Sequence, residues 1–137
     1  MKFITISAVL GLASMAAGCT IPSDYNKSVA TTILNVGRSR NVTQRLMLAL
    51  FEAGWVESHV NNCVFQQRPS QGWCNPSSLC LDVTHATNAF IDKAIRVATS
   101  SMTPGQLAQA VQVSAYPDRY DAAESKARSI IAAIGGF

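Results

Sequence analysis

The sequence predicts a small, mostly α-helical, disulfide-stabilised domain. At 137 residues the chain has the length of one domain, and 48% hydrophobic against 14% charged residues is enough to build a core. No stretch shows the two-residue alternation of a half-buried strand, whereas several show apolar residues at helical spacing. The predicted helices lie within residues 23–40, 41–57, 82–100, 103–112 and 121–134.

The first two helices are predicted from spacing and capping. After a polar arm, Val29, Ile33 and Gly37 share one face of a helix within residues 23–40. Asn41 is then a plausible N-cap, with Gln44 three residues on. We expect this cap to open the second helix, which carries two glutamates.

These glutamates, Glu52 and Glu57, are predicted to lie in different environments. At about 100° per residue, Glu57 projects along the apolar stripe of Leu46, whereas Glu52 lies on the other side beside Arg45 and solvent. An apolar surrounding and a helix C-terminus both disfavour ionisation. Glu57 is therefore the candidate general acid. The alternative is that Glu57 lies past the helix end and is simply solvated.

The next two helices have recognisable starts. Asp82 or Thr84 caps a helix that runs to about residue 100, with His85 in its first turn as a surface or capping residue. The sequence TPGQ at 103–106 combines a Thr cap, Pro at the first helical position and Gln at the third. This start predicts a helix that reaches Gln112.

A polar segment separates that helix from the last one. Residues 114–120 interrupt helical structure, because Pro117 disfavours the helical conformation at Tyr116. The last helix is predicted over 121–134 and ends at the two glycines 135–136.

The N-terminus has the pattern of a secretory signal peptide over residues 1–18. Lys2 precedes an apolar run at 3–12, and small residues follow at 16–18. The run is too short to span a bilayer. We expect a secreted domain of residues 19–137. The alternative is a lipoprotein in which Cys19 carries lipid.

The chain has four cysteines, which we expect to form two disulfides in an exported protein: Cys19, Cys63, Cys74 and Cys80. Three connectivities are possible. Cys74 and Cys80 enclose a short loop, so a bridge between them is geometrically easy and leaves Cys19 for Cys63. The spacing lacks the close pairs of zinc sites, and we expect no metal and no cofactor.

The charge pattern does not indicate a nucleic-acid partner. The net charge of +3 falls to +2 without Lys2, and no basic run of the kind found in nucleic-acid-binding proteins is present. We expect a monomer with no nucleic-acid partner and no stable membrane insertion.

Four segments resemble, in order, the lysozyme-like domains related to soluble lytic transglycosylases, and most closely the secreted muramidase-type domains of actinobacteria and filamentous fungi. The segments are ALFEAGWVES, VFQQRPSQGW, DVTHATNAF and AQAVQVSAYPDRY, within about residues 41–131. The resemblance implies a lysozyme-like helical domain with a loop-rich cleft. It implies that the enzyme cleaves peptidoglycan between N-acetylmuramic acid and N-acetylglucosamine.

By the same resemblance, Glu57 is the catalytic acid, and Gln66 and Tyr116 bind sugar or stabilise charge near the scissile bond. Trp73 is either a sugar-stacking platform or a buried anchor. The remaining candidates for sugar contact are Gln67, Arg68, Gln112, Ser114 and Tyr120.

One segment departs from the family pattern. Only residues 58–64 separate the Glu-Ser pair from Phe-Gln-Gln, whereas relatives have a longer connection that supplies a further carboxylate. Asp82 and Asp118 are the available second carboxylates, and a lytic transglycosylase needs none. A non-catalytic wall-binding or interaction protein, or a sequence that lacks a piece of this connection, stays an alternative.

Overall fold

A computed structural model describes residues 21–67, 69–74 and 77–137. Within these ranges the chain is helical and contains no strand. The predicted signal peptide, Cys19 and Arg68 lie outside the described residues. The elements in chain order are α2 (Lys27–Ser39), α3 (Gln44–Ser58), the short 3-10 turns η1 (Pro69–Gln71) and η2 (Ser77–Leu81), α4 (Val83–Val97), α5 (Pro104–Gln112), α6 (Arg119–Ala122) and α7 (Glu124–Ala133).

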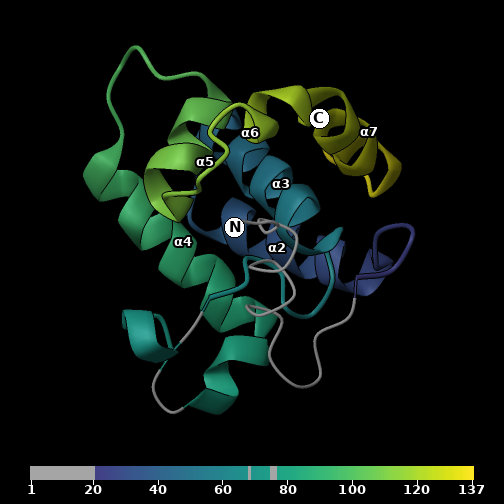
Figure 1. The fold of residues 1–137 in the computed structure, drawn as a ribbon. Helices are drawn as coiled ribbons and strands as arrows, with labels where there is room; N and C mark the ends of the chain where they lie inside the picture. The colour runs from purple at the N-terminus through teal and green to yellow at the C-terminus, as the bar shows by residue number, and fades with distance from the viewer. Residues whose placement is uncertain (1–20, 68, 75–76) are drawn as a thin grey trace, which may run out of the picture.

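Helix α3 is the centre of the fold. It packs against α2, α4, α5, α6 and α7, and Figure 1 shows it in the middle of the bundle with α4 and α5 on one side and α7 on the other. Every residue from 46 to 54 is buried. The single buried stripe predicted for this helix is therefore wrong, because neighbours surround it on all sides.

The N-cap of α3 also differs from the prediction. Thr43 is the cap, and its hydroxyl accepts a hydrogen bond from Leu46 N at 3.1 Å. Asn41 instead adopts a left-handed conformation with φ of 52°, which Asn tolerates better than most residues. The turn between α2 and α3 thus uses Asn41 for its bend and Thr43 for the cap.

The predicted starts of α4 and α5 are confirmed. Asp82 caps α4 by accepting from His85 N at 2.9 Å. Thr103 and Gln106 form a capping box at the start of α5, with Pro104 at the first helical position. These local signals act independently of tertiary packing, which is why the sequence reveals them.

The single last helix predicted over 121–134 is two helices. α6 and α7 meet at Ala123, whose φ of −90° and ψ of 2° depart from helical values. The core face of α7 is as expected, with Ala127, Ile130 and Ile131 buried. The break lets α6 lie against α3 and α5 while α7 packs along α3.

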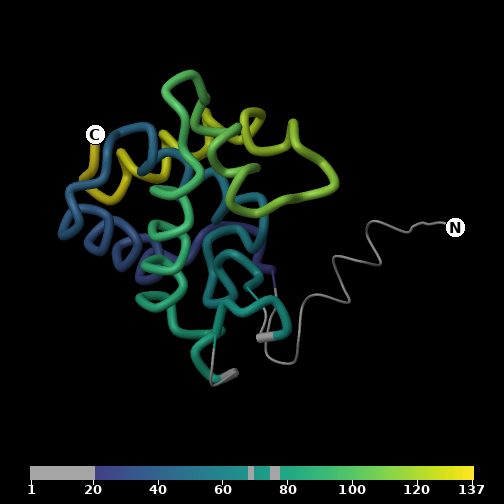
Figure 2. The backbone as a smooth tube through the Cα atoms, turned by 90° about the vertical axis from the view of Figure 1, so that its left-hand side faces the viewer, coloured from purple at the N-terminus to yellow at the C-terminus, as the bar shows by residue number. Residues whose placement is uncertain are grey.

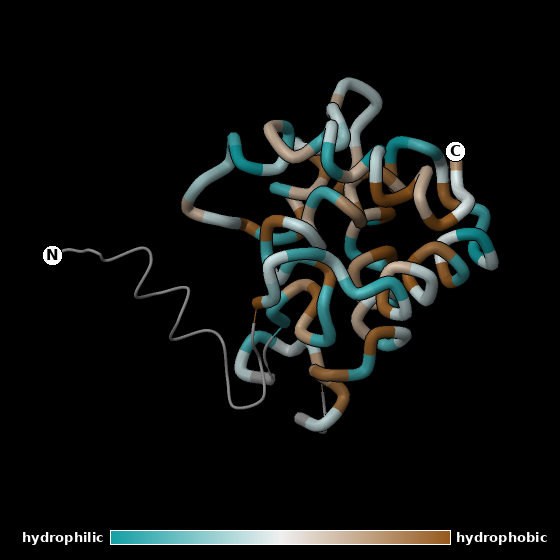
Figure 3. The backbone as a smooth tube through the Cα atoms, turned by 90° about the vertical axis from the view of Figure 1, so that its right-hand side faces the viewer, coloured by the Kyte–Doolittle hydropathy of each residue, from teal (hydrophilic) through white to brown (hydrophobic). Residues whose placement is uncertain are grey.

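The segment between α5 and α6 leaves the body of the domain. Figure 2 shows this yellow-green loop projecting outward, and Figure 3 shows that most of it is pale, near the middle of the hydropathy scale, whereas the hydrophobic stretches gather among the helices. Two exposed apolar side chains belong to it, Val113 and Tyr116.

The predicted Cys74–Cys80 disulfide is confirmed, with the two Cα atoms 5.3 Å apart. Cys63 also takes part in a disulfide, and Cys19, the partner predicted for it, lies outside the described residues. Among the helices that the structure describes, none is long and apolar enough to cross a membrane.

Candidate functional site

Glu57 lies at the last turn of the central helix and is partly exposed. The helix stops one residue later because His59 and Val60 both have positive φ, 53° and 57°. Val60 N then donates to Gly54 O at 2.9 Å, which closes the end of the helix. This turn fixes the position of Glu57 at the edge of the core.

The carboxyl group of Glu57 is held by a tyrosine from α6. The hydroxyl of Tyr120 donates to Glu57 Oε2 at 2.5 Å, and Tyr120 itself is fully buried. Burial raises the pKa of Tyr120, and the nearby Glu57 charge and the hydrogen bond raise it further. Tyr120 therefore remains a protonated donor across the physiological range. Because its side chain is fully buried, it has no exposed surface with which to line a sugar-binding cleft.

Gln66 contacts Glu57 through the main chain. Its Nε2 donates to the backbone oxygen of Glu57, and its own backbone has a φ of 50°. The neighbouring carbonyl of Phe65 accepts from Gln112 Nε2 at 2.9 Å. Two of the predicted glutamines thus tie the loop at 65–66 to the ends of α3 and α5.

The short connection after Glu57 is a closed, packed turn. Ser58 Oγ is buried, donates to Val64 O at 3.1 Å and accepts from Asn61 N at 3.0 Å. Val60 and Val64 are buried beside it. One hydroxyl therefore bridges both ends of the segment that departs from the family pattern.

A further cluster near Glu57, which the sequence analysis did not predict, lies around Trp55. The rings of Trp55 and His59 stack with centroids 4.0 Å apart, and Lys126 Nζ of α7 lies 4.5 Å from the Trp55 ring centre. His59 Nδ1 donates to Pro22 O at 2.6 Å, and Lys126 pairs with Asp24 at 3.2 Å. These contacts fasten the N-terminal arm across the end of α3.

The loop that precedes α6 presents Tyr116, which is 44% exposed. The Arg119 guanidinium lies 5.1 Å from the centre of its ring. Ser114 Oγ accepts from Tyr116 N at 3.0 Å, and Ser114 is partly buried. Because Tyr120 follows this loop in α6 and binds Glu57, the end of the loop is held close to the carboxyl group.

Trp73 and Gln67 are held by α4. Trp73 is half-buried against the core, its carbonyl accepts from His85 Nε2 at 2.9 Å, and Lys93 Nζ lies 5.4 Å from its ring centre. Gln67 is buried, and its Nε2 donates to Ala86 O at 3.0 Å. His85 thus anchors the aromatic loop, a role that its position in the first helical turn did not reveal.

The environments predicted for the two glutamates are wrong. Glu52 is the fully buried one, and Glu57 is partly exposed. Burial, followed by the charges of Asp121 and Glu124, raises the pKa of Glu52 from 4.5 to about 8, against a smaller lowering by Arg128. Because α3 is surrounded on all sides, the side facing away from Leu46 is also interior.

The two proposed second carboxylates have different surroundings. Asp82 is committed to the N-cap of α4, and Asp118 is exposed before α6 without a capping bond from its side chain. In the part of the chain that the structure describes, no group of three or more His, Cys, Asp or Glu residues could hold a metal ion.

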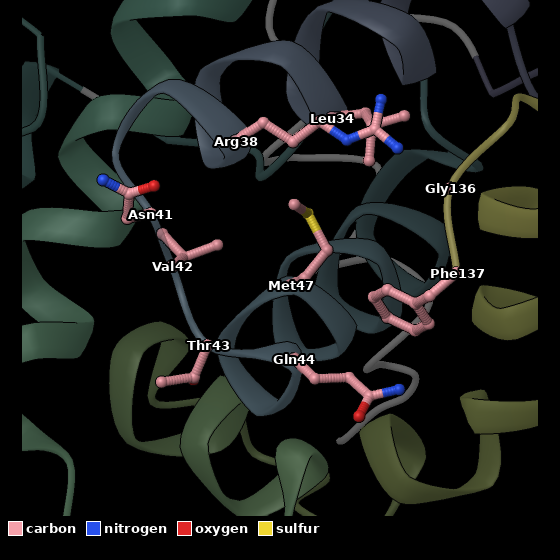
Figure 4. Close-up of a pocket in the computed structure, with 9 residues that line it drawn as sticks. All are labelled: Leu34, Arg38, Asn41, Val42, Thr43, Gln44, Met47, Gly136 and Phe137. Atoms are coloured by element: carbon pink, nitrogen blue, oxygen red, sulfur yellow. The ribbon is translucent and has the colours of Figure 1, made fainter.

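A hollow of about 440 Å³ lies at the other end of α3 from Glu57. Figure 4 shows Arg38, Val42, Met47 and Phe137 around it, together with the first residues of α3. The length of α3 places it roughly 20 Å from the carboxyl group of Glu57. This hollow is therefore not part of the candidate site.

Comparison of the chain with protein-family models, with curated proteins and with solved structures finds no match.

Proposed function

We propose that the protein is a secreted, lysozyme-like glycosidase that cleaves peptidoglycan between N-acetylmuramic acid and N-acetylglucosamine, with Glu57 as the general acid. The observation that carries the proposal is the hydrogen bond from Tyr120 to Glu57 Oε2 at 2.5 Å. It fixes a partly exposed carboxyl group at the end of a rigid helix, which is the geometry that proton donation to a leaving oxygen requires.

The two oxygens of Glu57 would have different roles. Oε2 is occupied by the Tyr120 hydroxyl, whereas Oε1 has no hydrogen bond to any of the described residues. In the proposed reaction Oε1 carries the proton to the glycosidic oxygen. Tyr120 would act as a positioning residue that keeps the carboxyl group from rotating away.

Contacts to the sugar are proposed on either side of this carboxyl group. Gln66 is already bonded to the Glu57 main chain, and Tyr116 is exposed one turn before Tyr120. Tyr116 and the half-buried ring of Trp73 would offer aromatic faces to the saccharide, while Gln66 would bond its polar groups.

The proposal leaves two routes for the second half of the reaction. Asp82 is used as a helix cap, so hydrolysis would have to use Asp118 or water alone. A lytic transglycosylase closes the muramoyl ring on its own hydroxyl and needs no second carboxylate. Mass spectrometry of the products separates the routes, because hydrolysis leaves reducing ends and transglycosylation leaves anhydro-muramoyl ends.

A second candidate function is favoured by the turn after Glu57. Ser58 closes this connection on itself, and the long cleft wall of the relatives has no counterpart within residues 58–64. A non-catalytic protein that binds the wall would retain the aromatic and amide groups without cleavage.

The deciding experiment is clearing of a peptidoglycan suspension by the oxidised secreted protein. We expect Glu57→Gln to reduce the rate by about 10²- to 10⁴-fold, because glutamine keeps the size of the side chain but cannot donate the proton. The matched control is Asp92→Asn, the equivalent change at an exposed carboxylate of α4 that acts on neither Glu57 nor Glu52. Binding to the wall without fragment release by the unmutated protein would exclude the glycosidase and support the second candidate.

A further inference from the structure

Glu52 is the one fully buried carboxyl group among the described residues, and the proposed reaction does not use it. Its exposed fraction is 0%, and neither Oε1 nor Oε2 has a hydrogen-bond partner there. A charged carboxylate without partners is costly in a protein interior. The native packing around Glu52 is therefore compatible with the neutral acid and opposed to the anion.

The charges around Glu52 increase this cost. Asp121 of α6 and Glu124 of α7 act on it with the same sign, and Arg128 is the one opposing charge. The Arg128 guanidinium is already bonded to Glu124 at 2.8 Å. If Glu52 ionised, three carboxylates would share Arg128, which is already bonded to one of them.

The other helices packed against α3 bring no further charge to bear on Glu52. α5 has no ionisable side chain. Arg40, the C-cap of α2, pairs with Asp92 of α4 at 2.7 Å. Lys93 of α4 donates to Val111 O at 2.7 Å. The electrostatic balance at Glu52 is set by α6 and α7.

The short helix α6, whose Asp121 acts on Glu52, also holds the candidate acid in place. Asp121 follows Tyr120 directly in α6, and Tyr120 donates to Glu57. α6 is only four residues long, so its position depends on its contacts with α3 and α5. Any charge that pushes α6 from α3 also pulls the Tyr120 hydroxyl from Glu57.

We propose that Glu52 is a proton-controlled latch: as the neutral acid it lets α6 and α7 close on α3, and its ionisation drives them apart and withdraws Tyr120 from Glu57. Only the last step, regulation of cleavage, rests on the proposed function. The opening of α6 and α7 is a property of the fold and can be measured without substrate.

The sign of the pH effect follows from proton binding. The closed state holds the Glu52 proton up to about pH 8, whereas in the open state the exposed carboxyl group has the ordinary glutamate pKa of 4.5. The opening equilibrium constant should therefore rise by up to about tenfold per pH unit between those values and become level above them.

Hydrogen exchange measured by mass spectrometry tests the latch between pH 5 and 9.5. After correction for the intrinsic exchange rate, peptides from residues 119–133 should show this rise and then a plateau near pH 8. Glu52→Gln should give a flat profile, because its side chain cannot ionise. A Glu52→Gln profile with the wild-type slope would overturn the latch and point to His59 or His85.

Two surface variants should shift the pH at which the plateau starts, in opposite directions. They test the latch even if Glu52→Gln does not fold. Arg128→Met removes the opposing charge, so the start of the plateau should move to higher pH. Glu124→Gln removes a like charge and frees Arg128, so the start of the plateau should move to lower pH. Shifts in the same direction, or no shift in either variant, would contradict the latch.

A clearing assay then distinguishes failure of the latch from failure of the proposed function. With both intact, clearing falls as the pH rises toward 8 and Glu52→Gln extends activity to higher pH. Opening without any clearing at any pH leaves the latch and removes the glycosidase. Clearing whose pH profile is the same in Glu52→Gln removes the regulatory step.

Discussion

The backbone amide of Gly105 donates to Asp121 Oδ1 at 3.2 Å, so that the start of α5 is joined directly to α6. The same carboxylate accepts from the Thr103 hydroxyl at 2.9 Å. Asp121 therefore contributes a second cap to α5, and the close approach is possible because residue 105 has no Cβ.

Gly105→Ala should destabilise the domain by about 1 to 3 kcal/mol, because a Cβ would lie 2.4 Å from the backbone nitrogen of Asp121. Denaturant unfolding measures the loss. The control is Gly54→Ala in α3, where the Cβ would meet Val64 at 3.4 Å, an ordinary contact. An equal loss in both variants would show that close approach is not the cause.

Ser58→Ala should cost about 1 to 3 kcal/mol of unfolding free energy, because the buried carbonyl of Val64 loses its donor. Thermal or denaturant unfolding monitored by circular dichroism reports the change. Ser129→Ala removes an exposed helix hydroxyl and should stay within about 0.5 kcal/mol of the wild type. A neutral Ser58→Ala would mean that the turn is held by its apolar residues alone.

Val113→Asn should raise stability by about 1 kcal/mol. Val113 has a φ of 52°, a conformation that is costly for a β-branched residue and tolerated by Asn. Its side chain is 71% exposed, so little packing is lost. Val113→Ile keeps the strain and should show no gain. Equal melting temperatures for all three proteins would refute the strain at this position.

Tyr120 and Glu57 should be energetically coupled. In a double-mutant cycle of Tyr120→Phe and Glu57→Ala, which removes the acceptor, we expect an interaction free energy of about 0.5 to 3 kcal/mol, as is usual for residues in direct contact. Unfolding of the two single variants and the double variant supplies the cycle. Strict additivity would indicate that the hydrogen bond contributes nothing to the position of the acid.

Local signals predicted the parts of the fold that local chemistry decides. The cap at Thr103 and the short Cys74–Cys80 loop are examples, because a few neighbouring residues suffice to form each of them. The prediction that Asn41 caps α3 was wrong because a local signal can have two meanings. Asn serves both caps and left-handed turns, and the sequence does not say which.

The site depended on tertiary structure and was predicted only in part. Assigning Glu52 to solvent assumed that α3 has an outer face, and it has none over residues 46–54. No glycine or proline lies next to Ala123, so no residue there indicates the break between α6 and α7. The contact between Trp55 and Lys126 joins residues 71 positions apart, which no local pattern can predict.

The burial of α3 on every side also has a kinetic consequence. Its backbone amides over residues 46–54 have no route to solvent through local fraying, because these residues are all buried and the other helices pack against α3. Exchange there requires unfolding of α3 itself, which departure of α6 and α7 alone does not produce, and these amides should define the slowest cooperative unit of the domain. Glu57 lies at the end of α3, next to this slowest unit. Its partners Tyr120 and Gln66 lie in α6 and in a loop, which can open before α3 unfolds.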